Sequence, residues 1–394
     1  MRALILGLCA SLMIACVDSD ADSPNFLDQG LEEQAGEDIA TEAGSMAGQI
    51  PMAGDVSQAG EPVEIIPAPQ QVSIATYNVQ NLFDFVDDPD NDEGEFTPNV
   101  GQWSRSTYEA KLNAIAEAIL LIDADIITFQ EVESEQVLSE LASAIRAKGG
   151  RYYQYQGISS TRDPRGIALG VLSIYPFDRE IGRPISSSIS CTNGESLDGS
   201  RPEARPIYEI NFWSDGTGIG AQSLTLLVNH WKSRASGDYP CQVREHHDRG
   251  ARQIRTLVDE WLTDDENRSV IVLGDFNAEE NELSLSQTID AYLNPAEVSG
   301  AALYNLWGEL GVTPSSSNNA TNSTYRYDGD WFRLDHIMVT PNMMNQGSGA
   351  WRVESFKLIR DAVLLRNGGP NSWNSQSQAG FSDHLPLKVT LTLR

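Results

Sequence analysis

Basic residues are scarce in this sequence, and so are long apolar segments. The 394 residues include 27 Lys and Arg against 56 Asp and Glu, which gives a formal net charge of −29 at pH 7. That balance excludes a basic protein that coats nucleic acid. The one long apolar run covers residues 3–15. A membrane-spanning helix needs roughly 20 apolar residues, so a polytopic membrane protein is excluded as well.

The first residues follow the order of a secretion signal. Arg2 precedes the apolar run and small residues end it, so we predict a signal peptide over residues 1–15. Met13-Ile14-Ala15-Cys16 also resembles a bacterial lipobox, in which Cys16 becomes the lipidated first residue of the mature chain. Secretion without lipid is the alternative. In either case we expect the protein outside the cytoplasm, anchored to a bacterial membrane through lipid or secreted.

Cysteine is rare, and none of the four cysteines has the spacing of a zinc site. Cys9 falls within the predicted signal peptide and Cys16 would carry the lipid, which leaves Cys191 and Cys241. In an oxidising compartment these two predict a disulfide bond. Two unrelated thiols are the alternative.

Residues 16–70 contain no Lys or Arg but twelve acidic residues, and Met-Ala-Gly occurs twice among them. Such a segment cannot bury enough apolar surface to offset its ordering entropy, so we predict an acidic, low-complexity tether. Residues 71–394 retain a net charge of −18. Because nothing in their composition marks an internal linker, we predict a single catalytic domain over residues 71–394.

Short apolar strands alternate with amphipathic helices from residue 71 onward, which predicts an α/β fold. Helices are predicted over residues 108–122, 135–147 and 243–262, with His246 and His247 on the solvated face of the last one. Two irregular stretches, 186–205 and 313–330, are predicted to be surface insertions. Strands are predicted over residues 72–77, 126–129, 167–173, 207–213, 224–229, 270–273, 334–340, 351–358 and 387–393.

Polar side chains cluster at the ends of these predicted strands, where an α/β sheet binds its ligands. Glu131, Asp275 and Asp383 are the acidic members of this set. Carboxylates favour a hard divalent cation bound through oxygen, so we expect Mg²⁺, with Mn²⁺ or Ca²⁺ as alternatives. Any one of these polar residues, taken alone with its neighbours in sequence, is also compatible with a turn or a strand-end ion pair.

Six motifs, taken in order, resemble the endonuclease/exonuclease/phosphatase superfamily of deoxyribonuclease I-like enzymes. The resemblance spans residues 72–393, and it implies a four-layer α-β-β-α sandwich of two packed mixed β-sheets with outer helices. It also implies hydrolysis of phosphoesters with a divalent metal. The motifs are Tyr77-Asn78-Val79, Gln130-Glu131, Asn229-His230, Gly274-Asp275-Phe276-Asn277, Leu334-Asp335-His336 and Ser382-Asp383-His384-Leu385-Pro386.

The same resemblance implies a role for each matched residue. Asn78, Glu131 and Asp383 would bind the metal. Asp275 would activate the attacking water, and Asp335 would raise the basicity of the His384 imidazole. The implied catalytic residues are His230, Asp275, Asn277, Asp335 and His384. His336 is expected to be a neighbour of the site and not a participant.

The basic residues near these motifs bear on the substrate. Residues 229–234 resemble a segment of bacterial secreted nuclease-like members, and Lys232, Arg234 and Arg165 would contact phosphates that flank the scissile one. Surface solubility is the alternative reading of each. The leading hypothesis is an extracytoplasmic, metal-dependent phosphodiesterase that acts on DNA or RNA, an endonuclease. We expect a monomer with no protein partner, in contact with a membrane only through a lipid anchor.

Two other functions stay open at this point. The first is a phosphatase or sphingomyelinase-like hydrolase of a small or lipid phosphoester. The charge of −18 over residues 71–394 favours it, because binding of duplex DNA draws on a basic surface. The second is a non-catalytic surface protein on the same fold.

Overall fold

The computed structural model describes residues 70–88, 93–98, 101–160, 162–163, 165–179, 205–212, 223–234 and 240–394. Cys16, Cys191 and the side chain of Cys241 lie outside this part of the chain. The signal peptide, lipid anchor, tether and disulfide bond therefore stay predictions. Within the described ranges, no helix has the length and apolar character needed to cross a membrane.

Two mixed β-sheets form the centre of the structure. The first has the order β14-β17-β1-β2-β4-β3 and the second the order β5-β6-β7-β8-β13-β10-β9. Parallel pairs occur at β1–β2, β7–β8 and β9–β10. The first sheet contains β14 (Trp351–Leu358), β17 (Leu387–Leu393), β1 (Gln71–Leu82), β2 (Ile126–Val132), β4 (Ala168–Ser173) and β3 (Tyr155–Ile158). The second contains β5 (Asp178–Arg179), β6 (Tyr208–Phe212), β7 (Leu224–His230), β8 (Ser269–Asp275), β13 (Asp335–Val339), β10 (Leu303–Asn305) and β9 (Ala291–Tyr292).

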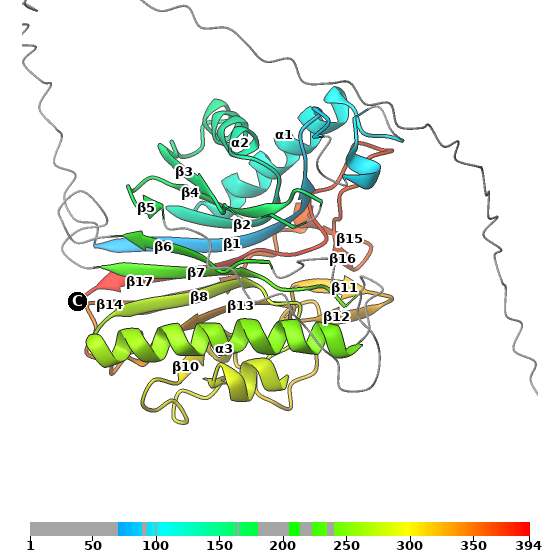
Figure 1. Ribbon diagram of the computed structural model, residues 1–394. Helices are drawn as coiled ribbons and strands as arrows, with labels where there is room; N and C mark the ends of the chain where they lie inside the picture. Colours follow the sequence, from blue (N-terminus) through cyan, green and yellow to red (C-terminus); the bar gives the residue numbers. More distant parts are fainter. Residues whose placement is uncertain are drawn as a thin grey trace, which may run out of the picture. The chain divides into compact units, whose positions relative to one another are not determined.

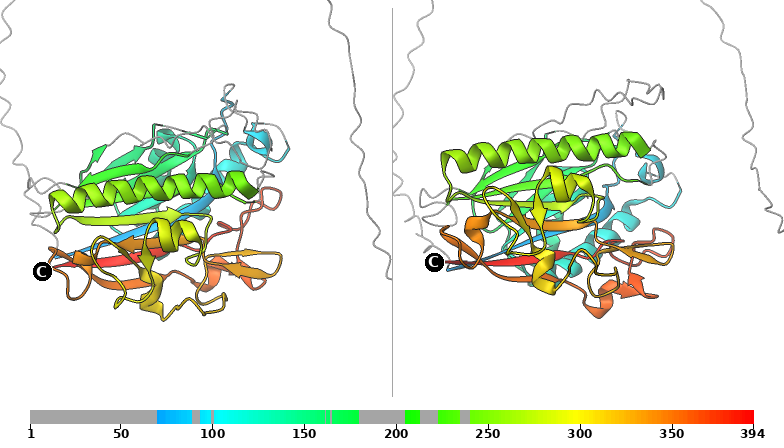
Figure 2. Two further views of the ribbon diagram at one scale, coloured as in Figure 1. Left: turned by 60° about the horizontal axis from the view of Figure 1, so that its bottom comes forward. Right: turned by 90° about the horizontal axis from the view of Figure 1, so that it is seen from below.

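Helices cover the outer faces of the two sheets, as Figure 1 shows. The helices α1 (Arg105–Ile122) and α2 (Glu135–Ala147) lie over the first sheet. The long helix α3 (Pro240–Asp264) lies along the outer face of the second sheet, beside the segment that carries β9 and β10 (Figure 2). The result is a four-layer α-β-β-α sandwich, so the fold class predicted from the sequence is confirmed.

The second sheet buries both of its faces, and alternation along its strands divides the core in two. Leu226 and Val228 of β7 belong to the core that the two sheets share. Leu227, between them, belongs to the core under α3, together with Ala251 and Ile254 of that helix. Strands buried on both faces read as continuous apolar runs, which explains why the sequence identified β7 and β8.

The helices over the first sheet begin at serine caps. The side chain of Ser104 accepts a hydrogen bond from the N–H of Thr107, and Ser134 accepts one from Val137. Such caps satisfy backbone donors that have no partner inside the helix. Because Ser104 sets the start, α1 begins three residues before the predicted Tyr108. The helix α2 has the predicted bounds.

The second predicted insertion is partly wrong. Residues 325–332 form a hairpin of β11 (Tyr325–Tyr327) and β12 (Asp330–Phe332), which pair in antiparallel fashion. Asp328 and Gly329 connect the strands, and both have positive φ, as a tight hairpin turn requires. Short elements also occur as η1 (Gly94–Phe96), η2 (Ser284–Thr288), η3 (Leu306–Leu310), η4 (Pro341–Met343), η5 (Ala362–Leu364), β15 (Leu365–Arg366) and β16 (Gly369–Pro370). The first predicted insertion lies almost wholly outside the described residues.

A buried ion pair anchors this hairpin to the segment that follows β8. Arg333, directly after β12, donates from Nε to Glu280 at 2.9 Å and also binds it through Nη2, and both side chains are buried. Replacing Arg333 with Ala leaves the Glu280 carboxylate buried without its partner. We expect a loss of about 3–5 kcal/mol in the free energy of unfolding.

The exposed pair of Arg352 with Glu354 provides the control, because exposed ion pairs contribute about 0–1 kcal/mol. Urea denaturation of Arg333→Ala and Arg352→Ala measures both losses. Equal, small losses would show that the buried pair does not anchor the hairpin.

Candidate active site

Three neighbouring strands of the second sheet place polar side chains at one end. The register pairs His230 of β7 with Asp275 of β8, and Asp275 with Asp335 of β13. Because β13 runs antiparallel to β8, its first residue meets the last residue of β8. All three side chains are buried. The strand ends therefore bring together two carboxylates and an imidazole that are far apart in the sequence.

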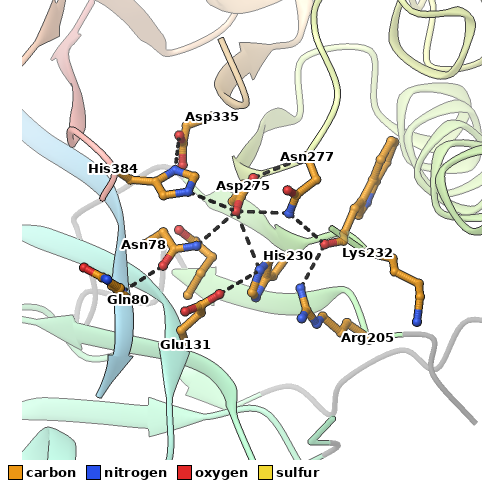
Figure 3. A network of polar contacts seen from close by, with 12 residues as sticks. Asn78, Gln80, Glu131, Arg205, His230, Lys232, Asp275, Asn277, Asp335 and His384 are labelled. Carbon is orange, nitrogen blue, oxygen red and sulfur yellow. Dashed lines mark hydrogen bonds and ion pairs between the residues drawn. The ribbon is translucent and has the colours of Figure 1, made fainter. Parts of the chain in front are cut away.

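Asp275 lies at the centre of the polar contacts (Figure 3). Its Oδ2 accepts from the Nδ2 of Asn78 at 3.0 Å and from that of Asn277 at 3.2 Å, and its Oδ1 accepts from the Asn277 N–H at 2.8 Å. The Nε2 atoms of His230 and His384 lie 3.6 and 3.9 Å from the same Oδ2. Asn78 belongs to the first sheet, so these contacts join both sheets at the site.

His384 comes from the segment that leads into β17. Its Nδ1 lies 2.8 Å from Oδ2 of Asp335, and both groups are buried. Ser382 ties this segment to β1, because its hydroxyl donates to the Asn78 carbonyl at 2.6 Å. The Tyr325 ring lies against the imidazole, with ring centroids 4.8 Å apart. The structure thus brings together the Asp335 and His384 side chains that the resemblance pairs.

Glu131 projects into the site from an irregular point of the first sheet. The register between β1 and β2 shifts between Asn78 and Leu82, and Glu131 itself has a φ of +69°. A residue other than glycine adopts this conformation rarely and at a cost in energy, and such residues concentrate at functional sites. The Glu131 Oε2 accepts from the N–H of Asn81 at 2.8 Å, and its Oε1 lies 3.5 Å from His230 Nε2.

Burial sets the protonation of the central groups, and their neighbours modify it. Burial raises the pKa of Asp275 to about 7, with His384 opposing and Asp335 adding to the rise. Burial lowers the pKa of His230 well below its ordinary value, and the Arg205 guanidinium lowers it further. For His384, burial alone would lower the pKa, but Asp335 and Asp275 raise it well above its ordinary value. At neutral pH, His384 is therefore charged and His230 neutral.

A cavity of about 410 Å³ opens onto these groups. Its polar lining includes Glu131, Asp275, Asp383 and both histidines, and one side of it is aromatic. The aromatic side comes from the β11–β12 hairpin. The lining residues are Asn78, Glu131, His230, Ser233, Arg234, Asp275, Asn277, Tyr325, Tyr327, Phe332, Leu334, Asp383 and His384.

A family model matches residues 73–393, and its description is the Endonuclease/Exonuclease/phosphatase family. The chain belongs to this family. The superfamily that the six motifs resemble is thereby confirmed. Membership assigns the chain to the metal-dependent phosphoric ester hydrolases. Comparison with the curated proteins found no match.

Several solved structures are similar to the chain at low sequence identity. A family protein from Bacteroides thetaiotaomicron is 18% identical with a TM-score of 0.48, and the match covers 83% of this chain and 99% of that one. A mannosyl-6-phosphatase from the same species is 16% identical with a TM-score of 0.48 and coverage of 82% and 100%. The human Nocturnin catalytic domain is 15% identical with a TM-score of 0.46 and coverage of 84% and 97%.

The donors in the cavity suit the divalent cation that this family uses. Glu131 and Asp383 offer carboxylate oxygens and Asn78 an amide oxygen, the ligands that Mg²⁺ prefers. Burial raises the pKa of Asp383, and the charge of Glu131 raises it further. This repulsion between two carboxylates is what a bound cation would relieve.

A second set of possible ligands fits less well. Single ligand atoms of Asp275, Asp335 and His384 lie within 4.8 Å of one another. However, the imidazole of His384 and the carboxylate of Asp335 already share a hydrogen bond. Asn78, Glu131 and Asp383 are therefore the residues that could hold the metal.

The basic residues expected at the rim differ in their positions. Arg234 lines the cavity and forms an ion pair with Glu282. Arg165 binds Asp163 and donates to the Asn81 side chain at 3.1 Å. Within the described part of the chain, Lys232 is not one of the lining residues. Contact of these residues with substrate phosphates stays a prediction.

The predicted solvent exposure of His247 is wrong. Its side chain is buried, its ring lies 5.3 Å from that of Trp231 between centroids, and its Nε2 lies 2.8 Å from the Lys232 carbonyl oxygen. Trp231 directly follows His230, so His247 packs against the residue that follows the end of β7. His336 lies outside the site as expected, bonded to Asn305 and to the Ala278 carbonyl.

Sequence reasoning missed several residues at or beside the site. The aromatic residues Tyr325 and Tyr327 lie in the stretch 313–330 that is predicted to be irregular, and Phe332 lies two residues beyond it. Their signal was present as Asp328-Gly329 between aromatic residues, which is typical of a hairpin. Arg205 donates to the Trp231 carbonyl at 2.9 Å, the same oxygen that accepts from Asn277. No local pattern marks an arginine for such a contact.

Proposed function

We propose that the chain is an extracytoplasmic, Mg²⁺-dependent phosphodiesterase that cleaves nucleic acid, acting as an endonuclease. The cluster around Asp275 supports phosphoester hydrolysis, because a base, hydrogen-bond donors and metal ligands line one cavity. The observation that carries the choice of nucleic acid is the aromatic side of this cavity. Nucleobases stack on aromatic rings, whereas a small sugar phosphate has no such group.

The residues of the chain supply the following steps. Asp275, with a pKa of about 7, accepts the proton of the attacking water, since a base works best near the operating pH. Asn277 orients that water or the phosphate. His384, held charged by Asp335, donates to an oxygen of the phosphate, and His230 donates a second hydrogen bond. Glu131, Asp383 and Asn78 would hold the metal, which when bound would neutralise charge on the phosphate.

The β11–β12 hairpin forms the aromatic side. Tyr325 and Tyr327 are two residues apart on β11, so their side chains share a face, and the register places Phe332 opposite Tyr325. Tyr327 has 64% of its surface exposed, although it is aromatic. An exposed ring beside a catalytic cavity is available for stacking, and base–aromatic stacking contributes about 1–3 kcal/mol per base.

Loss of these rings should therefore weaken hydrolysis in a base-dependent way. We expect the double substitution of Tyr327 and Phe332 by Ala to lower kcat/KM about 10- to 100-fold on a single-stranded oligonucleotide. An oligonucleotide of the same length, abasic beside the scissile phosphate, should lose less than about threefold. Steady-state kinetics on both substrates gives the comparison. Tyr327→Phe is the control, because it keeps the ring.

Equal losses on the two substrates would mean that the rings do not contact a base. Such a result would remove the main support for nucleic acid while leaving phosphoester hydrolysis intact.

Hydrolysis of a small or lipid phosphoester is the second candidate. It is favoured because two of the basic residues already form ion pairs, Arg165 with Asp163 and Arg234 with Glu282. A polynucleotide would have to compete with these carboxylates for the two arginines. Incubation with plasmid, single-stranded RNA, a sugar monophosphate and sphingomyelin, each with Mg²⁺ or Mn²⁺, ranks the substrates. Faster turnover of the last two would reject the nuclease proposal.

The proposed location outside the cytoplasm is supported by the order of residues in the first 16 positions. We further propose a monomer that is attached to the membrane by lipid on Cys16. The mass of the mature N-terminal peptide from a bacterial membrane fraction tests this attachment. An unprocessed N-terminus in that peptide would reject it.

A further inference from the structure

The end of β1 contains a strained turn beside the cavity. Gln80 and Asn81 have φ values of +55° and +58°, so two consecutive residues other than glycine adopt the left-handed conformation. This conformation costs roughly 1–2 kcal/mol per residue and persists only where neighbouring contacts hold it. Some group in the structure must therefore stabilise this turn.

Lys111 of α1 is the side chain that binds both backbone carbonyls of this turn. Its side chain is 0% exposed, and its Nζ donates to the carbonyl oxygens of both Gln80 and Asn81, to the latter at 3.0 Å. Phe96 and Trp373 lie around the ammonium, with ring centroids 6.0 and 5.8 Å away. Burying a charged group is costly unless it is paired and hydrogen-bonded. Burial lowers the pKa of Lys111 to about 7, against the attraction of Glu131 and Asp383, and the two carbonyls accept hydrogen bonds from its Nζ.

The turn that Lys111 binds also contacts two of the residues assigned to the metal. The N–H of Asn81 donates to Glu131 Oε2 at 2.8 Å, and the N–H of Gln80 donates to Asn78 Oδ1 at 3.0 Å. In each of these residues the carbonyl binds Lys111 while the N–H binds a side chain of the site. A shift of the carbonyls would therefore move the two N–H groups away from Asn78 and Glu131.

We propose that Lys111 is a positioning residue for metal binding, acting through the turn at Gln80 and Asn81. This inference rests on the proposed metal site at Asn78, Glu131 and Asp383. Lys111 itself touches neither metal nor substrate. Residues that orient metal ligands typically change metal affinity 10- to 100-fold when they are replaced. The effect of Lys111 is therefore on metal affinity and not on the chemical step.

The test measures Mn²⁺ binding to the full chain, by titration calorimetry and by the electron paramagnetic resonance signal of free Mn²⁺. We expect Lys111→Met to raise the Kd at least tenfold. At saturating Mn²⁺, kcat and the KM for substrate should stay within about threefold of wild type. Lys111→Arg, which keeps the charge and two N–H donors, should restore most of the affinity.

Lys388 of β17, whose ammonium lies at the C-terminal end of α1, offers a control. Its ammonium also donates to two backbone carbonyls, those of Ile122 and Asp123, at 2.7 and 2.6 Å. Lys388→Met should leave the Mn²⁺ affinity unchanged, whatever it does to thermal stability. If both Met variants lower stability and neither changes the Kd for Mn²⁺, Lys111 is merely structural and the proposal is overturned.

Two further variants keep the test decisive. If Lys111→Met does not fold, Lys111→Gln replaces it, since this amide still donates to one carbonyl. A Kd raised at least threefold supports the proposal, and an unchanged Kd overturns it. Glu131→Gln distinguishes a wrong metal site from a wrong role for Lys111. Binding that does not depend on Glu131 refutes the metal site itself, whereas binding that depends on Glu131 but not on Lys111 refutes the inference alone.

Discussion

Replacing Glu131 with Gln is expected to lower kcat/KM for phosphoester hydrolysis about 10³-fold. The substitution keeps the size of the side chain and the acceptor for the Asn81 N–H, and it removes the charge. A metal supplies several kcal/mol of charge stabilisation in the transition state, and each 1.36 kcal/mol is a factor of ten in rate. Loss of about 4 kcal/mol therefore corresponds to the stated change. Initial rates across a Mg²⁺ titration measure it.

Glu133, two residues further along, provides the control. Its side chain is also buried, but it accepts a hydrogen bond from the Asp84 N–H and does not line the cavity. Burial raises the pKa of Glu133 to about 8, so the group is mainly neutral at pH 7. Glu133→Gln therefore replaces one neutral group with another and should change the rate less than threefold. Equal losses for the two variants, or full wild-type activity in excess EDTA, would contradict the metal site.

Much of the fold was predictable because burial leaves a periodic pattern. Strands such as β7 and β8, buried on both faces, show as runs of branched apolar residues. The inner face of α3, which carries Ala251, Ile254 and Val258, shows as a stripe of helical period. In both cases the side chains themselves carry the information. The number of layers followed from the resemblance and is confirmed by the two sheets.

The irregular parts were not predictable in the same way. The left-handed backbone at Gln80, Asn81 and Glu131 depends on contacts with distant residues, among them Lys111. Glycine would have signalled such a conformation, but none of the three is glycine. His247 is buried although its neighbours in the helix are charged, because its ring packs against Trp231. In each case a contact with a residue distant in the sequence determines the backbone conformation or the burial, and a short segment of sequence does not contain that contact.

The candidate site shows the same division. The strand ends predicted which polar residues meet, and the structure brings Asn78, His230 and His384 around the Asp275 carboxylate. Their individual roles stay predictions. The aromatic side of the cavity was not predicted, because the short hairpin around Asp328-Gly329 follows directly on a long stretch rich in Ser, Asn and Thr.

Asp335 and His384 should lose activity as one unit. We expect Asp335→Asn and His384→Ala each to lower kcat about 10²- to 10⁴-fold, the range for general acid–base groups. Without the carboxylate, the imidazole loses the partner at 2.8 Å that fixes its orientation and keeps it charged. Without the imidazole, Asp335 has nothing to orient. The double variant should therefore be at most about threefold slower than the slower single variant, as found for residues that act together.

His336→Ala provides the matched control for these variants. His336 is a buried histidine next to Asp335, but its nitrogens bind Asn305 and the Ala278 carbonyl on the other side of β13. Its loss should lower the Tm and leave kcat within about threefold, because no contact of its ring reaches Asp275. The double-mutant cycle compares single-turnover rates of the wild type, the two single variants and the double variant, all measured well below the lowest Tm. Multiplicative losses in the double variant would show that Asp335 and His384 act independently. In that case a group other than Asp335 would have to keep the His384 imidazole charged.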